Sequence, residues 1–318
     1  MTNIALFEAK NAPPLDTLAQ LGKLDLKPNL NLLKRARSKW WTNQLSFALK
    51  YSVDESDILY KMYSHSINCC TILTQNGSKI TSRFCNTRIC NVCNRIRTAK
   101  MMNGYISQMA NFKNIESITL TIPNCKADEL DKKIEEMYRV YVQIKDVFKK
   151  KGIILNGMRK MEITYNAITD TYHPHYHNLM EGNYGKQFVD EWLKRFPKAN
   201  IKGQDVMDAD QNSLNEIFKY TTKILTKSSK GGFDVYVHAI NTIMRSMYGK
   251  RSIQTFGSIR KVTEDVDDVK AQEYDNIPNY EFMEWIWKDC DWVNALKPNS
   301  IETLTGYVPP EKEINFVE

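Results

Sequence analysis

The chain has 318 residues, of which 42% are hydrophobic, 25% charged and 11% aromatic, and 44 basic against 37 acidic residues give a net charge of +7. This composition excludes a mainly disordered chain, and no apolar run reaches the roughly 18 to 20 residues of a membrane span. We therefore expect a cytoplasmic protein of one to three domains with no membrane partner. The small excess of positive charge is only a weak indication of a polyanionic partner.

The first hundred residues combine basic side chains, tryptophans and cysteines. The first sixty residues predict helical structure and are partly basic, and the stretch 30–41 places lysines and arginines beside Trp40 and Trp41. This stretch either lies on DNA phosphates or exposes a solvated basic face while the tryptophans pack inward. We expect residues 1–106 to form an N-terminal DNA-binding region that contains a cysteine motif at 69–93.

Residues 107–230 alternate between strand and helix patterns. Period-two or β-branched patterns predict strands at 117–122, 158–165, 172–180 and 201–207. Apolar stripes of helical period predict helices at 128–151, 186–196 and 212–227. This order predicts an α+β fold, a ferredoxin-like βαββαβ unit with one appended helix. Residues 231–318 are rich in aromatic side chains but contain no chemical motif, so we treat them as a C-terminal region of unknown role.

Three of the five histidines occur together, at positions 173, 175 and 177, in the run His-Pro-His-Tyr-His. Side chains alternate along a strand, so the three imidazoles share one face and Tyr176 points to the other. Neutral imidazoles on one face are natural ligands of a divalent cation, whereas the alternative is a packed row of hydrogen-bonded histidines.

A carboxylate beside these histidines would favour Mg²⁺ or Mn²⁺. Glu162 lies on the preceding predicted strand, and a hairpin that turns near Ile168 places it opposite residue 175 or 176. We therefore predict a metal site formed by His175, His177 and Glu162, with His173 as the competitor of Glu162 for the third ligand.

The last predicted helix carries a second group of chemical interest. Glu216, Tyr220 and Lys223 are spaced four and three residues apart, so they share one helical face. A phenol, a carboxylate and an ammonium can serve as nucleophile, general base and charge neutraliser in phosphoryl transfer. The same spacing is also common on solvated helix surfaces.

The histidine run, followed by Glu-Ile-Phe-Lys-Tyr-Thr-Thr-Lys at 216–223, resembles motifs two and three of the HUH endonuclease superfamily. It specifically resembles the rolling-circle plasmid replication initiators with one catalytic tyrosine. The segment 84–95 is similar to a cysteine-containing stretch of that family, and strand 117–122 would be its first motif. The resemblance covers residues 69–225.

This resemblance implies a metal-dependent DNA endonuclease and nucleotidyltransferase. His175 and His177 would bind Mg²⁺ or Mn²⁺, and Tyr220 would attack single-stranded or hairpin origin DNA, leaving a 5′-phosphotyrosine and a 3′-OH. Glu216 would activate water or the incoming 3′ end at termination, and Lys223 would stabilise the charged phosphate. A host helicase and polymerase would be further partners. No phosphate-binding loop is present, which agrees with a transfer that conserves bond energy.

Four cysteines predict a structural Zn²⁺ site. Cys85, Cys90 and Cys93 fall within nine residues, and the adjacent Cys69 and Cys70 offer a fourth thiolate. We expect Cys70, or alternatively Cys69, to complete the site; the alternative is that these are buried free cysteines. The zinc would brace a basic element that binds DNA, formed by Arg88, Arg95, Arg97 and Lys100. Lys219, on the predicted helix that carries Tyr220, is a further candidate for DNA contact.

Two other functions share parts of this pattern. A single-tyrosine HUH transposase has the same chemistry and motif order, whereas conjugative relaxases usually place the tyrosine ahead of the histidines. A zinc-braced DNA-binding regulator without catalysis would use the histidines structurally. Metal-dependent cleavage of single-stranded DNA with covalent attachment separates the enzymes from the regulator.

Overall fold

The computed structural model describes residues 29–218, 226–227, 233–263, 265–266, 272–273, 277, 280–299, 302–311 and 314–317. The chain forms two compact units: unit 1 comprises residues 1–96, 227–233 and 265–315, and unit 2 comprises residues 97–226, 234–264 and 316–318. The region 231–318 therefore contributes to both units, and the sequence-based boundaries at 106 and 230 stay a prediction.

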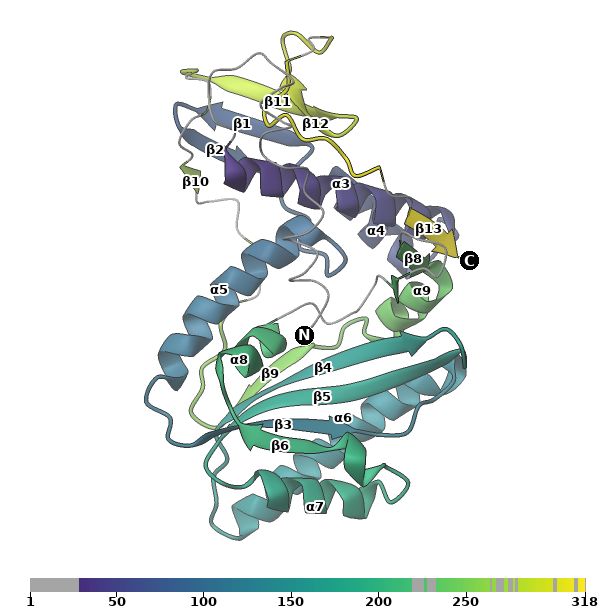
Figure 1. Cartoon of the computed structure of the whole chain (residues 1–318), viewed down its shortest axis with the longest axis vertical. Helices are drawn as coiled ribbons and strands as arrows, with labels where there is room; N and C mark the ends of the chain where they lie inside the picture. The colour runs from purple at the N-terminus through teal and green to yellow at the C-terminus, as the bar shows by residue number, and fades with distance from the viewer. Residues whose placement is uncertain are drawn as a thin grey trace. The chain divides into compact units, whose positions relative to one another are not determined.

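In its described residues, unit 1 contains the helices α3 and α4 and an antiparallel sheet with the strand order β10-β2-β1-β11-β12 (Figure 1). Helix α3 begins where the Oδ1 atom of Asn29 accepts hydrogen bonds from the backbone N–H groups of Asn31 and Leu32. The β1–β2 hairpin turns at Gly77, whose φ of +58° favours glycine. The bounds are α3 Leu30–Tyr51, α4 Ile58–Asn68, β1 Ile72–Asn76, β2 Lys79–Ser82, β10 Gln272–Glu273, β11 Met283–Lys288 and β12 Asp291–Asn294.

The aromatic strands from the C-terminal part of the chain complete the core of unit 1. Trp285 on β11 donates a hydrogen bond of 2.8 Å to Gln75 on β1, and Trp292 on β12 donates one of 2.9 Å to the carbonyl of Cys70. Both indoles are buried in the same cluster as the cysteines that the sequence singles out. The C-terminal strands thus help to hold the cysteine segment in place.

Unit 2 contains an antiparallel sheet with the strand order β6-β3-β5-β4-β9 (Figure 1). The strands are β3 Ile115–Thr121, β4 Gly157–Asn166, β5 Thr171–Glu181, β6 Asp205–Asp208 and β9 Ile253–Phe256. The helices are α6 Ala127–Lys150, α7 Gly185–Arg195, α8 Gln211–Phe218 and α9 Val237–Ser246. Helix α5, Asn91–Met109, begins in unit 1 and continues into unit 2. The short strands β7 Thr226–Lys227, β8 Phe233–Tyr236 and β13 Ile314–Val317 lie where the chain passes between units.

Different helices pack on the two faces of the unit 2 sheet (Figure 1). On one face, α6 buries a stripe of apolar residues three and four positions apart, including Ile134, Tyr141 and Ile144, against the strands. On the other face, Ile217 and Phe218 of α8 form a buried cluster with Met158 of β4 and Leu179 of β5. The histidines of β5 lie on this second face.

Two predicted elements are partly wrong. Residues 201–203 form a 3₁₀ helix, because the Asn200 side chain accepts a hydrogen bond from the N–H of Lys202, so the expected strand 201–207 is only β6. The helix predicted at 212–227 is described as α8 up to Phe218, and residues 226–227 form β7, where a β-branched threonine suits extended backbone. Among the helices of the described ranges, none has the length and apolarity that crossing a bilayer requires.

Candidate active site and metal centres

Strand β5 places the three histidines on one face of the sheet. The rings of His173 and His175 lie 5.2 Å apart and those of His175 and His177 4.9 Å apart, so the imidazoles form a continuous row. Tyr176 points to the opposite face, where it is fully buried against Tyr141 of α6 and Trp192 of α7. The alternation expected from the sequence is confirmed, and the packed tyrosine fixes which face the imidazoles use.

Glu162 of β4 lies directly opposite His175 in the β4–β5 ladder, one of the two positions expected from the sequence. Ligand atoms of Glu162, His175 and His177 lie within 4.8 Å of one another. The Oε2 atom of Glu162 is 3.6 Å from the Nε2 atom of His177. Glu162 and His175 are buried and His177 is 21% exposed, so the group has one side open to solvent.

His173 lies outside this group of three, so the geometry favours Glu162 over His173 as the third member. The Nδ1 atom of His173 is 2.8 Å from the Oδ1 atom of Asn124. Burial, followed by the neighbouring charge of His175, lowers the pKa of His173 to about 4. His173 is therefore a neutral imidazole near pH 7, held at the end of the row by the asparagine.

The donor set of two imidazoles and one carboxylate fits a divalent cation. The Nδ1 atom of His175 is 3.0 Å from the backbone carbonyl of His173, and with the proton on Nδ1 this contact leaves the Nε2 lone pair available to a metal. A protein carbonyl that orients a metal-binding histidine in this way is the usual outer partner of such ligands. The residues present therefore suit a divalent cation, and the carboxylate is the member of the set that Mg²⁺ or Mn²⁺ would prefer.

Lys160 is a member of this site that the sequence analysis missed. Its ammonium is fully buried, 3.1 Å from the Oε2 atom of Glu162, and it donates a hydrogen bond of 3.0 Å to the backbone carbonyl of Glu216. Lys160 precedes Glu162 by two residues and lies opposite His177 in the ladder. A lysine two positions from a candidate ligand in a buried strand was the signal that could have identified it.

The helix that leads toward the candidate nucleophile packs beside this site. Phe218 of α8 is buried, its ring stacks on that of Tyr105, and its carbonyl accepts a hydrogen bond of 3.0 Å from the Thr98 hydroxyl. Glu216 is half-buried. Tyr220, Lys223 and Lys219 lie outside the described residues, so their roles remain predictions.

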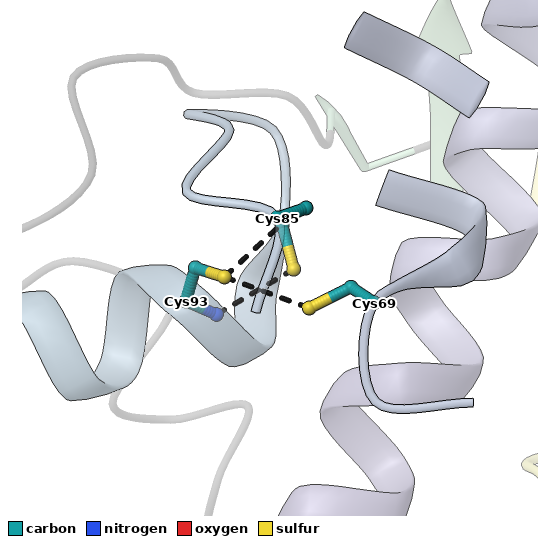
Figure 2. Close-up of side chains that lie close together, drawn as sticks. Cys69, Cys85 and Cys93 are labelled. Carbon is teal, nitrogen blue, oxygen red and sulfur yellow. Dashed lines mark hydrogen bonds between the residues drawn. The ribbon is translucent and has the colours of Figure 1, made fainter. Parts of the chain in front are cut away.

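The second group of candidate ligands consists of four cysteines of unit 1. Cys69 follows α4, Cys85 follows β2, Cys90 immediately precedes α5, and Cys93 lies in the first turn of α5. Figure 2 shows Cys69 and Cys85 directed toward Cys93, with sulfur–sulfur distances to Cys93 of 3.5 and 3.6 Å. The sulfur atoms of all four lie within 4.8 Å of one another.

These distances fit a tetrahedral zinc site. Four sulfur atoms at the usual Zn–S distance of about 2.3 Å form a tetrahedron with edges of about 3.8 Å, close to the separations observed. Backbone N–H groups of Thr87 and Cys93 donate to the sulfurs of Cys85 and Cys90, respectively, as suits thiolates. Burial raises the pKa of the Cys90 thiol, so ionisation of this sulfur requires a compensating cation.

The geometry selects Cys69 rather than Cys70, the first choice of the sequence analysis, for the group of four. Cys70 adopts the left-handed conformation, with a φ of +53°, whereas Cys69 is extended. Adjacent residues with such different backbone conformations direct their side chains differently, and spacing along the chain does not reveal which one faces the other cysteines.

A buried lysine lies beside the cysteines. Lys39 of α3 is fully buried, and its ammonium donates hydrogen bonds to the carbonyl of Ile67 and to the hydroxyl of Thr71. Burial lowers the pKa of Lys39, while negative charge on the cysteines, Cys69 first, raises it. A cation at this place suits a tetrathiolate zinc site, whose net charge is −2.

Comparison with known families supplies an independent test. A family model described as "Replication protein" matches residues 78–295, which is more than half of the chain. The matched range includes strand β2, the histidine strand β5 and helix α8. The chain belongs to this replication protein family.

Curated members of the family align over parts of the chain. Three relatives bear the name "Protein rep". One from a Bacillus species is 30% identical over 45% of this chain and 57% of its own length, and one from Bacillus amyloliquefaciens is 32% identical over 41% and 45%. One from Staphylococcus aureus is 29% identical over 44% of this chain and 69% of its own length. The chain thus spans about half the length of the first two relatives, and no solved structure matches it.

The basic residues predicted to contact DNA differ in accessibility. Arg95 is exposed, Arg88 and Lys100 are half-buried, and Arg97 is buried with 8% of its surface accessible. Arg95 is therefore the member of the described set best placed to reach a phosphate, and Arg97 the least suited to it. For this family member, DNA contact by these residues remains a prediction.

Proposed function

We propose that this chain is a plasmid rolling-circle replication initiator that nicks single-stranded origin DNA and rejoins strands through Tyr220. The observation that carries the proposal is the grouping of Glu162, His175 and His177 on the sheet face where α8 packs. The sequence places Tyr220 two residues beyond the end of α8 as described. Membership in the replication protein family supports the same function.

The finer fold assignment belongs to this proposal. The strand order β6-β3-β5-β4 is the fourth, first, third and second strand of the predicted βαββαβ unit, and all neighbours are antiparallel. This order supports a ferredoxin-like HUH core with β9 added at one edge. A central position in this sheet gives β4 and β5 neighbours on both sides, which holds the ligand strands rigidly.

In the proposed reaction, the phenolic oxygen of Tyr220 attacks the scissile phosphorus and the 3′ oxygen of the preceding nucleotide leaves. A 5′-phosphotyrosine and a free 3′-OH result, and one phosphodiester replaces another, so no nucleotide triphosphate is consumed. Mg²⁺ or Mn²⁺ held by Glu162, His175 and His177 would supply charge stabilisation at the phosphate. Glu216 would activate water or the incoming 3′-OH at termination, and Lys223 would neutralise developing charge.

We further propose that Cys69, Cys85, Cys90 and Cys93 hold a structural Zn²⁺. The site would join α4, the segment after β2 and the start of α5, three parts of the chain that pack in one core cluster. Arg95 lies two residues after Cys93, so the zinc would also orient an exposed cation toward DNA. The proposed partners are single-stranded or hairpin origin DNA and the host helicase and polymerase, in the cytoplasm.

The test is covalent capture of DNA. Single-stranded oligonucleotides tiled across the DNA that carries the gene are incubated with the protein and Mn²⁺, and products are separated on a denaturing gel. We expect a protein–DNA adduct that EDTA abolishes and that Tyr220→Phe lacks, while Tyr51→Phe, at an 83% exposed tyrosine of unit 1, retains it. Binding without any adduct would instead indicate the non-catalytic regulator.

The role of Glu216 has its own test. We expect Glu216→Ala to form the adduct at the normal rate but to release the product slowly, because only the termination step needs a base there. Release from the preformed adduct is followed after adding a strand with a free 3′-OH. Unchanged release would remove Glu216 from the mechanism without affecting the assignment of Tyr220.

A further inference from the structure

The candidate metal site contains a buried lysine beside its carboxylate. Lys160 is fully buried, and its ammonium lies 3.1 Å from the Oε2 atom of Glu162, the one carboxylate of the candidate ligand group. The same ammonium donates to the backbone carbonyl of Glu216 on α8. Lys160 therefore lies between the metal ligands and the helix that precedes Tyr220.

The charges of these groups have a direct consequence. With neutral histidines, the ammonium of Lys160 and the carboxylate of Glu162 sum to zero, so the carboxylate already has a cation. A divalent metal bound to the same carboxylate brings this buried group to +2. Like charges at such short range repel, and the burial of Lys160 and Glu162 reduces the screening by water, so binding of the metal alone is disfavoured.

A phosphodiester restores the balance because it brings negative charge to the site. We propose that Lys160 is a positioning residue that weakens divalent-metal binding in the free protein and makes the metal and a DNA phosphodiester bind cooperatively. The inference rests on the proposed function, since it takes Glu162, His175 and His177 as the metal ligands. By linkage, the metal must strengthen DNA binding by the same factor as DNA strengthens metal binding.

The first test measures Mn²⁺ binding without DNA, by electron paramagnetic resonance of free Mn²⁺ at pH 7.5. Lys160→Met keeps the length of the side chain but removes the charge, and we expect its Mn²⁺ Kd to be at least about tenfold lower than that of the wild type. If Lys160 only oriented Glu162, the substitution would weaken Mn²⁺ binding. An equal or higher Kd therefore overturns the proposal.

A control is Lys250→Met, which neutralises a partly buried lysine of unit 2 that pairs with Asp131 and should leave the Mn²⁺ Kd unchanged. Thermal unfolding establishes that each variant is folded. Because Lys160→Met leaves the buried carboxylate without its ammonium, Mn²⁺ should also raise the melting temperature of this variant more than that of the wild type. An equal rise in both would contradict the proposal.

The second test uses the wild type alone, so it holds even if the variant does not fold. The Mn²⁺ Kd is measured with and without a saturating mixed-sequence single strand of 30 nucleotides. We expect the strand to lower the Kd roughly tenfold or more, and no change would overturn the inference. If Mn²⁺ binds neither with nor without the strand, the metal site and this inference both fail. If Mn²⁺ and DNA bind cooperatively but no adduct forms, the proposed function fails while this inference stands.

Discussion

Two adjacent cysteines offer a matched pair of substitutions for the zinc site. Cys69 and Cys70 are both buried, with 2% and 1% of their surfaces accessible, but only Cys69 belongs to the group of four. We expect Cys69→Ser to lose zinc and Cys70→Ser to keep it. The two changes are chemically identical and one residue apart, and the difference that matters for zinc is whether the lost thiol faces the other three.

The magnitude follows from the number of ligands. A structural zinc site contributes about 10 to 16 kcal/mol of apparent binding free energy, or about 2.5 to 4 kcal/mol for each of four thiolates. Cys69→Ser should therefore weaken zinc binding at least about 50-fold. Cys70→Ser keeps the backbone bonds of Cys70 to Arg83 and Trp292, so it should change the free energy of unfolding by only about 1 kcal/mol.

The assay is the zinc content per chain after dialysis against a chelator that buffers free Zn²⁺, read by inductively coupled plasma mass spectrometry. We expect one zinc per chain for the wild type and Cys70→Ser, and much less for Cys69→Ser. Zinc loss in Cys70→Ser with retention in Cys69→Ser would reverse the ligand assignment. A wild type that binds no zinc would refute the site itself.

Three further predictions concern unit 2, each read by chemical denaturation in EDTA. Gly257→Ala should lower the free energy of unfolding by at least about 3 kcal/mol, because a Cβ there would lie 2.1 Å from a neighbouring side-chain oxygen. Gly249 also has a positive φ but lies in open space, so Gly249→Ala should lower the free energy of unfolding by only about 1 kcal/mol. Trp192→Phe removes the indole N–H that donates to the carbonyl of Thr121, and it should lower the free energy of unfolding by about 2 kcal/mol. An unchanged free energy of unfolding would show that this hydrogen bond is dispensable. The wild type should lose stability as the pH falls from 6.5 to 4, because His173 takes up its proton at a higher pH in the unfolded chain than in the folded one. His173→Gln should lessen this loss. If the substitution leaves the dependence of stability on pH unchanged, the lowered pKa of His173 is contradicted.

The parts of unit 2 that the sequence predicts well are those with strong local patterns. Helix α6 has apolar residues at regular three- and four-residue spacing and charges that suit its ends, so its predicted range of 128–151 is one residue from the observed bounds at each end. The hairpin of β4 and β5 follows from two alternating segments and a short turn. That local turn also fixes the register, so the position of Glu162 opposite His175 could be foreseen.

What could not be predicted depends on residues far apart in the chain. The pairing of β1 with β11 joins segments about 200 residues apart, and nothing local to either strand specifies it. The choice of Cys69 over Cys70 depends on the positive φ of Cys70. Glycine and asparagine are the residues from which a positive φ is usually predicted, and a cysteine gives no such indication. The contact of Lys160 with the carbonyl of Glu216 depends on how α8 packs, which the strand pattern does not contain.

The division of unit 1 among distant stretches of chain affects the order of events during synthesis. A ribosome releases β1 and β2 early, but their partner strands β11 and β12 emerge only after the sheet of unit 2 has been made. Until then β1 has one unpaired edge, and its backbone N–H and C=O groups are open to pairing with another chain. The nascent chain therefore passes through a stage in which the cysteines are already present but the tryptophans of the same core cluster are not.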